Sequence, residues 1–179
     1  HSQRLIDQFI STRLQHHVTF SPYGYIILQK TIGHESEEVF EEILKRIFTL
    51  IGTKNYPVRR QALHRAMATL MAEKSMTLAG CQIVNKTNEW WITREPAAVG
   101  PPIFVNVPGT YHWDDRFIIE VDAKIPCRID TLGNGLNQLD EESKEQLKPI
   151  PSLILQTLPA LWQGKNLVAP PKGFLFLVY

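Results

Sequence analysis

The 179-residue sequence has little of what marks several large classes of protein. It has two cysteines, Cys81 and Cys127, both in apolar surroundings, which favours free core thiols over a structural disulfide. No apolar run reaches the ~18 residues that a membrane span requires. The net charge of +1 creates no strong field toward nucleic acid. No secretory signal is visible. We therefore expect a cytoplasmic protein with no membrane partner.

Self-contained catalytic sets are missing as well. Neither a P-loop nor a dinucleotide-binding glycine pattern occurs, and no cysteines and histidines have the spacing of a zinc site. No local pattern marks a nucleophile elbow, and the adjacent carboxylates of Asp114 and Asp115 would diverge in an extended segment. We therefore predict no catalytic residue, no metal site and no cofactor within this chain.

What the sequence does have is enough apolar content, 44%, for a sizeable core. The pattern predicts an α+β fold in three parts. Residues 1–96 are expected to form a helical subdomain with β-hairpins, and residues 113–179 a small, mainly β subdomain. Residues 97–112 between them are expected to form a proline-rich linker with a short extended piece at residues 103–107.

Three amphipathic helices are predicted in the first part. The first covers residues 3–16. The second has Ser36 as its N-cap, an apolar stripe over residues 39–51 and Gly52 as its stop. The third begins at Pro57. The glutamates that begin the second helix are interpreted as solvated side chains, because no other ligand type is spaced among them.

Strands are predicted on both sides of the linker. They cover residues 18–20, 25–28, 76–84, 89–94, 113–121, 126–132, 160–162, 167–169 and 173–178. Residues 134–148 are polar, and Pro151 starts a short helix that Pro159 ends. Trp90 and Trp91 must face opposite sides of their strand. One belongs to the core, and the other is either covered by a neighbouring element or presents a flat face to a nucleobase.

One strong local charge bias lies between Lys45 and Lys74. Seven basic residues against one acidic residue, Glu73, give this window a charge of +6. Two interpretations stay open: an ordinary solvated helix face, or a surface that binds phosphate groups. The candidate RNA-binding residues are Lys45, Lys54, Arg59, Arg60, His64 and Arg65.

The segment Trp113-Asp114-Asp115-Arg116-Phe117 organises the second half of the chain. We place it at a strand entry, where its apolar ends can anchor a sheet. Asp114 and Arg116 lie two residues apart and can pair on one side of an extended chain.

Four further pieces occur in order with this segment: residues 52–60, which contain Tyr56-Pro57 and Arg59-Arg60; Thr77-Leu78-Ala79-Gly80-Cys81; Arg94-Glu95-Pro96; and Leu158-Pro159-Ala160-Leu161-Trp162. In this order the chain resembles the C-terminal region of bacterial tRNA(Ile)-lysidine synthetases, particularly the alphaproteobacterial type. Asp115 stands where that family favours glycine, and Ala79 stands where glycine is frequent. Aspartate tolerates left-handed dihedrals better than most residues do.

The resemblance implies a role for the parent protein. Such enzymes use ATP to activate the wobble cytidine of tRNA(Ile) with a CAU anticodon, and the amine of lysine then attacks to form lysidine. Their N-terminal ATP-pyrophosphatase domain carries a Ser-Gly-Gly-x-Asp-Ser loop, which is absent here. ATP and Mg are therefore implied for that missing domain, which would be this chain's partner, and the fragment alone would not be an enzyme. The chain begins at His1 without methionine, which fits a piece of a longer protein.

The implied role of the C-terminal region is to grip the tRNA, with Arg59 and Arg60 as the strongest candidates. A structural motif is expected from six residues of the matched pieces: Trp113, Asp114, Arg116, Phe117, Arg94 and Glu95. Whether the chain forms a homodimer stays open. An alternative is a protein-interaction module that docks a separate catalytic domain. In that case residues 5–10 would expose Leu5, Phe9 and Ile10. A free-standing hydrolase is a third hypothesis, which lacks any catalytic set.

Overall fold

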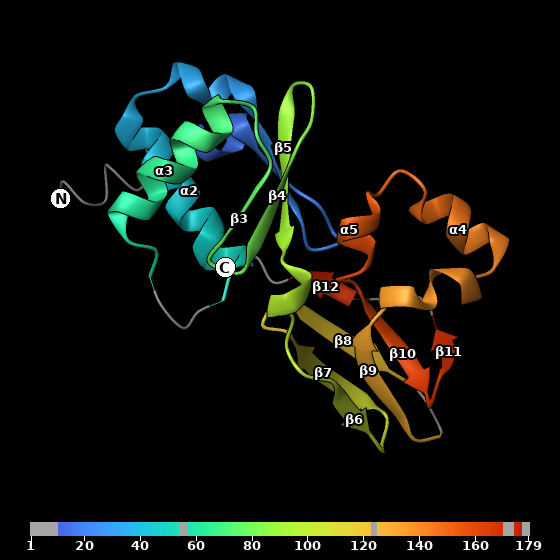
Figure 1. Ribbon diagram of the computed structural model, residues 1–179. Helices are drawn as coiled ribbons and strands as arrows, with labels where there is room; N and C mark the ends of the chain where they lie inside the picture. Colours follow the sequence, from blue (N-terminus) through green and yellow to red (C-terminus); the bar gives the residue numbers. More distant parts are fainter. Residues whose placement is uncertain (1–10, 54–56, 123–124, 170–173, 177–179) are drawn as a thin grey trace. The chain divides into compact units, whose positions relative to one another are not determined.

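The computed structural model describes residues 11–53, 57–122, 125–169 and 174–176 (Figure 1). The chain divides into two compact units. The first comprises His1–Ser21 and Tyr25–Glu95, and the second comprises Pro22–Gly24 and Pro96–Tyr179. The first unit has the long helices, and the second has two of the three sheets. The predicted α+β class is therefore confirmed.

The first unit is an antiparallel sheet with helices on one side (Figure 1). The strand order is β1-β2-β5-β4-β3. Its elements are a helical segment at 11–17, β1 (Val18–Phe20), β2 (Ile26–Gln29), the 3-10 helix η1 (Lys30–His34), α2 (Glu37–Ile51), α3 (Arg60–Met71), β3 (Met76–Leu78), β4 (Cys81–Asn85) and β5 (Glu89–Arg94). Residues 3–10 of the helix predicted over residues 3–16, including Leu5, Phe9 and Ile10, lie outside the described residues.

Helix α2 forms as its sequence predicts. The Ser36 side chain accepts a hydrogen bond from the Val39 amide, and Gly52 ends the helix with its N–H bonded to the Phe48 carbonyl. The apolar stripe is fully buried, and each such side chain contributes roughly 1.5–3 kcal/mol on leaving water. Phe40 stacks on the buried Trp90 of β5, with ring centroids 6.2 Å apart, so α2 closes the core over the sheet.

Two expectations for this unit are corrected. Helix α3 begins at Arg60 with Arg59 as N-cap, because Pro57 fixes only φ and that value suits an extended chain equally well. The strand predicted over residues 76–84 turns back at Ala79 and Gly80, whose φ angles are 53° and 76°. Such a left-handed pair makes a tight hairpin turn. Ala79 thus adopts the conformation that glycine would adopt with less strain.

The second unit contains two antiparallel sheets, with strand orders β11-β10-β9-β6 and β12-β8-β7. Its elements are η2 (Pro96–Ala98), β6 (Ile103–Val105), β7 (Gly109–Trp113), β8 (Phe117–Val121), β9 (Cys127–Thr131), η3 (Gly133–Gln138), α4 (Glu141–Leu147), α5 (Ser152–Leu155), β10 (Pro159–Gln163), β11 (Asn166–Ala169) and β12 (Phe174–Phe176). The closing hairpin β10–β11 is confirmed.

The structure corrects one prediction for the second unit and adds detail to two others. Residues 97–112, predicted as a linker with a short extended piece at residues 103–107, contain β6 at that place and also most of β7. The strand expected over residues 113–121 is broken by a turn. The polar stretch after residue 133 contains η3 and α4, and Asp140 caps α4 by accepting a hydrogen bond from the Ser143 amide at 2.7 Å.

Cys81 and Cys127 are buried free thiols, as predicted. Burial raises the pKa of the Cys127 thiol. Within the described ranges, no helix is long and apolar enough to cross a bilayer.

Candidate nucleic-acid interface

The basic side chains of α3 lie beside glutamates of α2. Arg60 Nε is 3.2 Å from Glu41 Oε1, and His64 Nε2 is 2.9 Å from Glu41 Oε2. The other ring nitrogen of His64 lies 3.7 Å from Glu37. The hydrogen bond with His64, followed by contacts with Arg60, lowers the pKa of Glu41. Glu41 is therefore an anion at neutral pH, and it offsets part of the positive charge on this face.

A second glutamate compensates the basic residues of α2 itself. Glu42 lies 3.6 Å from the ammonium group of Lys45 and 3.0 Å from Arg46 Nε. The sequence window of +6 left these glutamates out because it began at Lys45. The positive field of the surface is consequently weaker than the window suggested.

Arg59 and Arg65 differ from the other candidates. Both are exposed, and neither has an ion-pair partner within the described part of the chain. Arg59 also lines a mostly apolar hollow with Pro57, Val58 and Ala62. Lys54 lies outside the described residues. Among the predicted RNA-binding residues that the structure describes, Arg59 and Arg65 therefore present the least compensated charge.

The predicted structural motif is a buried ion pair at a turn. Arg116 Nε donates to Asp114 Oδ2 at 2.6 Å, and the two side chains are 0% and 2% exposed. The guanidinium also donates to the carbonyls of Thr157, at 2.9 Å, and Gly24, at 3.4 Å. The second Asp114 oxygen accepts from the Gly100 amide at 2.7 Å. The pair thus links four segments of the second unit, and the predicted pairing of Asp114 with Arg116 is observed.

The motif lies at the entry of β8, as predicted, but it forms a turn where an extended chain was expected. Asp114 and Asp115 have φ angles of 56° and 55°, and β7 pairs with β8 through Trp113 and Phe117. Asp115 therefore adopts the left-handed conformation that suits glycine, as the departure from the family pattern implied. The indole N–H of Trp113 donates to the Pro101 carbonyl at 3.1 Å.

Arg94 and Glu95 lie at the end of β5, where they make contacts within the first unit. Arg94 is 3% exposed at the end of β5, opposite Cys81. The Glu95 amide donates to the Gly80 carbonyl at 2.7 Å, which ties the end of β5 to the β3–β4 turn.

The neighbouring tryptophans face opposite sides of β5, as predicted. Trp90 is 1% exposed in the core. Trp91 stacks on Tyr25 with centroids 5.1 Å apart and planes 14° from parallel, and the Lys86 ammonium lies 5.8 Å from its ring centroid. Of the two alternatives for the outer tryptophan, coverage by a neighbour is the one observed.

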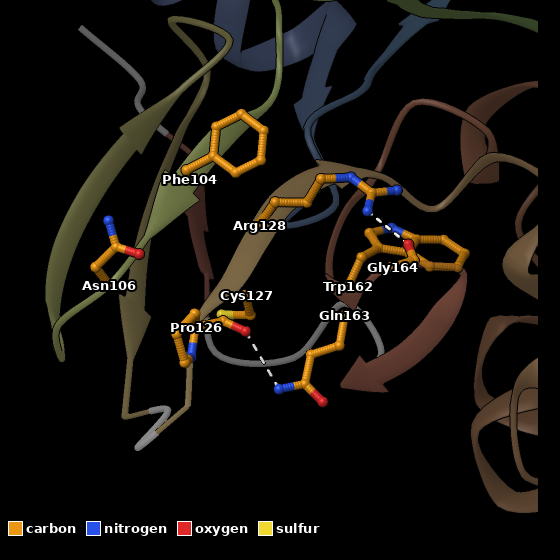
Figure 2. Close-up of a pocket in the computed structure, with 8 residues that line it drawn as sticks. All are labelled: Phe104, Asn106, Pro126, Cys127, Arg128, Trp162, Gln163 and Gly164. Carbon is orange, nitrogen blue, oxygen red and sulfur yellow. Dashed lines mark hydrogen bonds between the residues drawn. The ribbon is translucent and has the colours of Figure 1, made fainter.

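A row of side chains in the second unit was not predictable from the sequence pattern. Phe104 of β6 is opposite Arg128 of β9, and Arg128 is opposite Trp162 of β10 (Figure 2). The residues are far apart in sequence, and only the strand pairing brings them together. No group of three metal-ligating side chains occurs among the residues that the structure describes.

Sequence comparison identifies a relative of this chain. Over 135 residues, 75% of its length, the chain is 30% identical to a curated protein of Ruegeria pomeroyi. That relative is a tRNA(Ile)-lysidine synthase. The resemblance inferred from the ordered motifs is therefore confirmed. The aligned part is 31% of the lysidine synthase's length, which fits a match to its C-terminal region. No protein-family model matches the chain.

Proposed function

We propose that this chain is the tRNA-binding C-terminal part of a tRNA(Ile)-lysidine synthase. The similarity to the Ruegeria pomeroyi enzyme carries this proposal, because it supports a role in tRNA modification. In the complete cytoplasmic protein, a separate N-terminal domain would use ATP and Mg to join lysine to the wobble cytidine of tRNA(Ile) with a CAU anticodon. The present chain would hold the tRNA for that reaction.

The start of α3 is the proposed contact surface. Arg59 and Arg65 would bind backbone phosphates and release condensed counterions. Arg60 and His64 are held by Glu41, so they would contribute less. Phosphate contacts position an RNA without reading its sequence. Selection of the correct tRNA would then depend on its shape and on contacts to unpaired nucleotides.

The test is fluorescence anisotropy of this chain with tRNA(Ile) bearing CAU, a methionine tRNA and an unrelated duplex RNA, over a salt series. We expect the chain to prefer the isoleucine tRNA. The double variant Arg59→Ala/Arg65→Ala should weaken binding and reduce the salt slope by about one to two. The matched control is Lys144→Ala/Lys148→Ala on α4, where both lysines pair with glutamates three residues away. Its salt slope should equal that of the unmodified chain.

Two outcomes would contradict the proposal. Folded chain that binds none of the RNAs at low salt would exclude RNA binding and favour the protein-docking alternative. Equal losses of affinity in both double variants would show that α3 is not the contact surface.

A further inference from the structure

Phe104 is the most exposed of the large apolar side chains in the described residues, at 73%. Its position on β6 makes it the direct cross-strand neighbour of Arg128 on β9. Cross-strand neighbours on one face have Cβ atoms ~4.5–5.5 Å apart. An exposed aromatic side chain and an arginine therefore project from the same face of this sheet, on neighbouring strands.

Arg128 is fixed in place from the opposite side. Its Nη1 donates to the Gly164 carbonyl at 2.6 Å, and its Nε donates to Asp130 at 3.2 Å. The guanidinium carbon lies 5.7 Å from the centroid of the Trp162 ring. Figure 2 shows the guanidinium extended toward Trp162 and Gly164, while Phe104 stands apart from that cluster. Arg128 is thus preorganised against Trp162, and the ring of Phe104 is left open to solvent.

The Trp162 ring, which packs against Arg128, is itself held in place by the surrounding backbone. Its indole N–H donates to the Thr131 carbonyl at 3.0 Å. A Cβ added at Gly135 would lie 2.6 Å from the ring, so the η3 backbone packs directly on it. Trp162 is only 9% exposed, which makes it a support for Arg128 and leaves Phe104 as the accessible ring.

The surrounding pocket has mixed chemistry. Its walls include Phe104, Pro126 and Trp162, and its polar groups include the amides of Asn106 and Gln163 (Figure 2). Arg128 is the one charged side chain among the described residues that line it, and its partner Asp130 lies outside the lining. These groups match the parts of a nucleotide. The flat apolar face suits a base, the cation suits a phosphate, and the amide groups suit the hydrogen-bonding edge of the base.

We propose that Phe104 and Arg128 form a stacking subsite for an unpaired nucleotide of the bound RNA. The base would lie on the Phe104 ring, and its phosphate would lie toward Arg128. This inference rests on the proposed tRNA binding. A base inside a duplex does not present its face, so the ligand must offer a single-stranded loop or end.

The test uses the full chain with Phe104→Ala, Phe104→Leu and Phe104→Trp, and measures affinity for CAU-bearing tRNA(Ile) and for a blunt duplex RNA. Because base–aromatic stacking is lost, the Ala and Leu variants should bind the tRNA roughly 5- to 100-fold more weakly. The Trp variant should keep full affinity. Binding to the duplex should not change in any variant. Val107→Ala is the matched control, since Val107 is also exposed, at 62%, in the same unit.

The outcomes separate this inference from the proposed function. Leu or Ala variants that bind tRNA as tightly as the unmodified chain would overturn the stacking subsite and leave tRNA binding intact. A loss of duplex binding equal to the loss of tRNA binding would also overturn it, because the effect would not depend on unpaired bases. If the unmodified chain binds no tRNA, the proposed function and this inference fail together.

Discussion

Arg116 and Asp114 form an ion pair of 2.6 Å in which both side chains are almost completely buried. Further hydrogen bonds join the guanidinium to the carbonyls of Thr157 and Gly24, and the second carboxylate oxygen accepts from the Gly100 amide. A buried ion pair adds little net stability over an apolar pair, but removal of one partner leaves an uncompensated buried charge.

The first prediction concerns loss of this guanidinium. Arg116→Met should lower the free energy of unfolding of the second unit by about 3–5 kcal/mol, because Asp114 would stay buried without its partner. Urea denaturation followed by tryptophan fluorescence measures this, since Trp113 lies in the same turn. Lys148→Met is the control, because Lys148 and Glu145 are both exposed and such pairs contribute only ~0–1 kcal/mol. Similar losses in the two variants would refute the assigned role of Arg116.

The second prediction separates backbone strain from the ion pair at the same turn. Asp114 and Asp115 have nearly equal left-handed φ angles, but only Asp114 bonds to Arg116. Asp115→Gly should stabilise the unit, by up to about 1 kcal/mol, because glycine adopts this conformation without strain. Asp114→Gly should destabilise it by several kcal/mol despite the same relief of strain. Thermal unfolding of both variants checks the contrast, which would vanish if the backbone alone decided stability.

The third prediction uses two glycines that both have positive φ. A Cβ at Gly24 would lie 2.4 Å from the ring of Phe117, which is fully buried, while a Cβ at Gly164 would meet nothing within 4 Å. Gly164→Ala should therefore cost only the left-handed backbone strain, about 1–2 kcal/mol. Gly24→Ala should cost more, by about 1–3 kcal/mol, because the packed core must move. Equal costs in chemical denaturation would mean that the Phe117 contact is easily relieved.

The fourth prediction concerns acid. The pKa of Glu41 is lower in the folded state than its ordinary value of 4.5, first through His64 and then through Arg60. A lowered folded pKa contributes stability above the unfolded value and loses it as the pH falls. Glu41→Gln should therefore flatten the decline of unfolding free energy between about pH 5 and about pH 3.

A urea series at several pH values measures this decline, with Glu145→Gln on α4 as the control. Part of the decline should persist in the Glu41 variant. The pKa of Glu35 is lowered by its hydrogen bond with His17, and that of Glu38 is lowered by its own backbone amide. A decline of unchanged steepness in Glu41→Gln would show that the α2–α3 contact does not contribute to acid stability.

Much of the fold could be read from local patterns. The apolar stripe of α2, its Ser36 cap and its Gly52 stop were all predictable, because a helix is decided by neighbours three or four residues apart. The two-sided placement of Trp90 and Trp91 followed from the alternation of a strand. The turn at Asp114-Asp115 was missed because neither position carries the glycine that usually marks a turn. The turn at Ala79-Gly80 was missed although Gly80 marks it, because apolar residues on both sides continue the strand pattern.

The candidate site was less predictable. Six basic residues were predicted from a local charge bias, and the resemblance ranked Arg59 and Arg60 first, yet Glu41 compensates Arg60 and His64 from another helix. The Phe104–Arg128–Trp162 row had no signal, because its members come from three strands that pair only in the folded unit.

By itself, therefore, the sequence determined the α+β class, the helix limits of α2, the pairing of Asp114 with Arg116, and the resemblance to a lysidine synthetase. These four features depend on residue types that are close together in the sequence, or on motifs that occur in a fixed order along it. Only the tertiary structure decided which arginines remain uncompensated and that Phe104 stands open beside Arg128. The net charge of a surface depends on which charged side chains from other segments lie within a few ångströms of it. The exposure of a ring depends in the same way on which segments pack against it. Neither set of distances follows from the linear order of the residues.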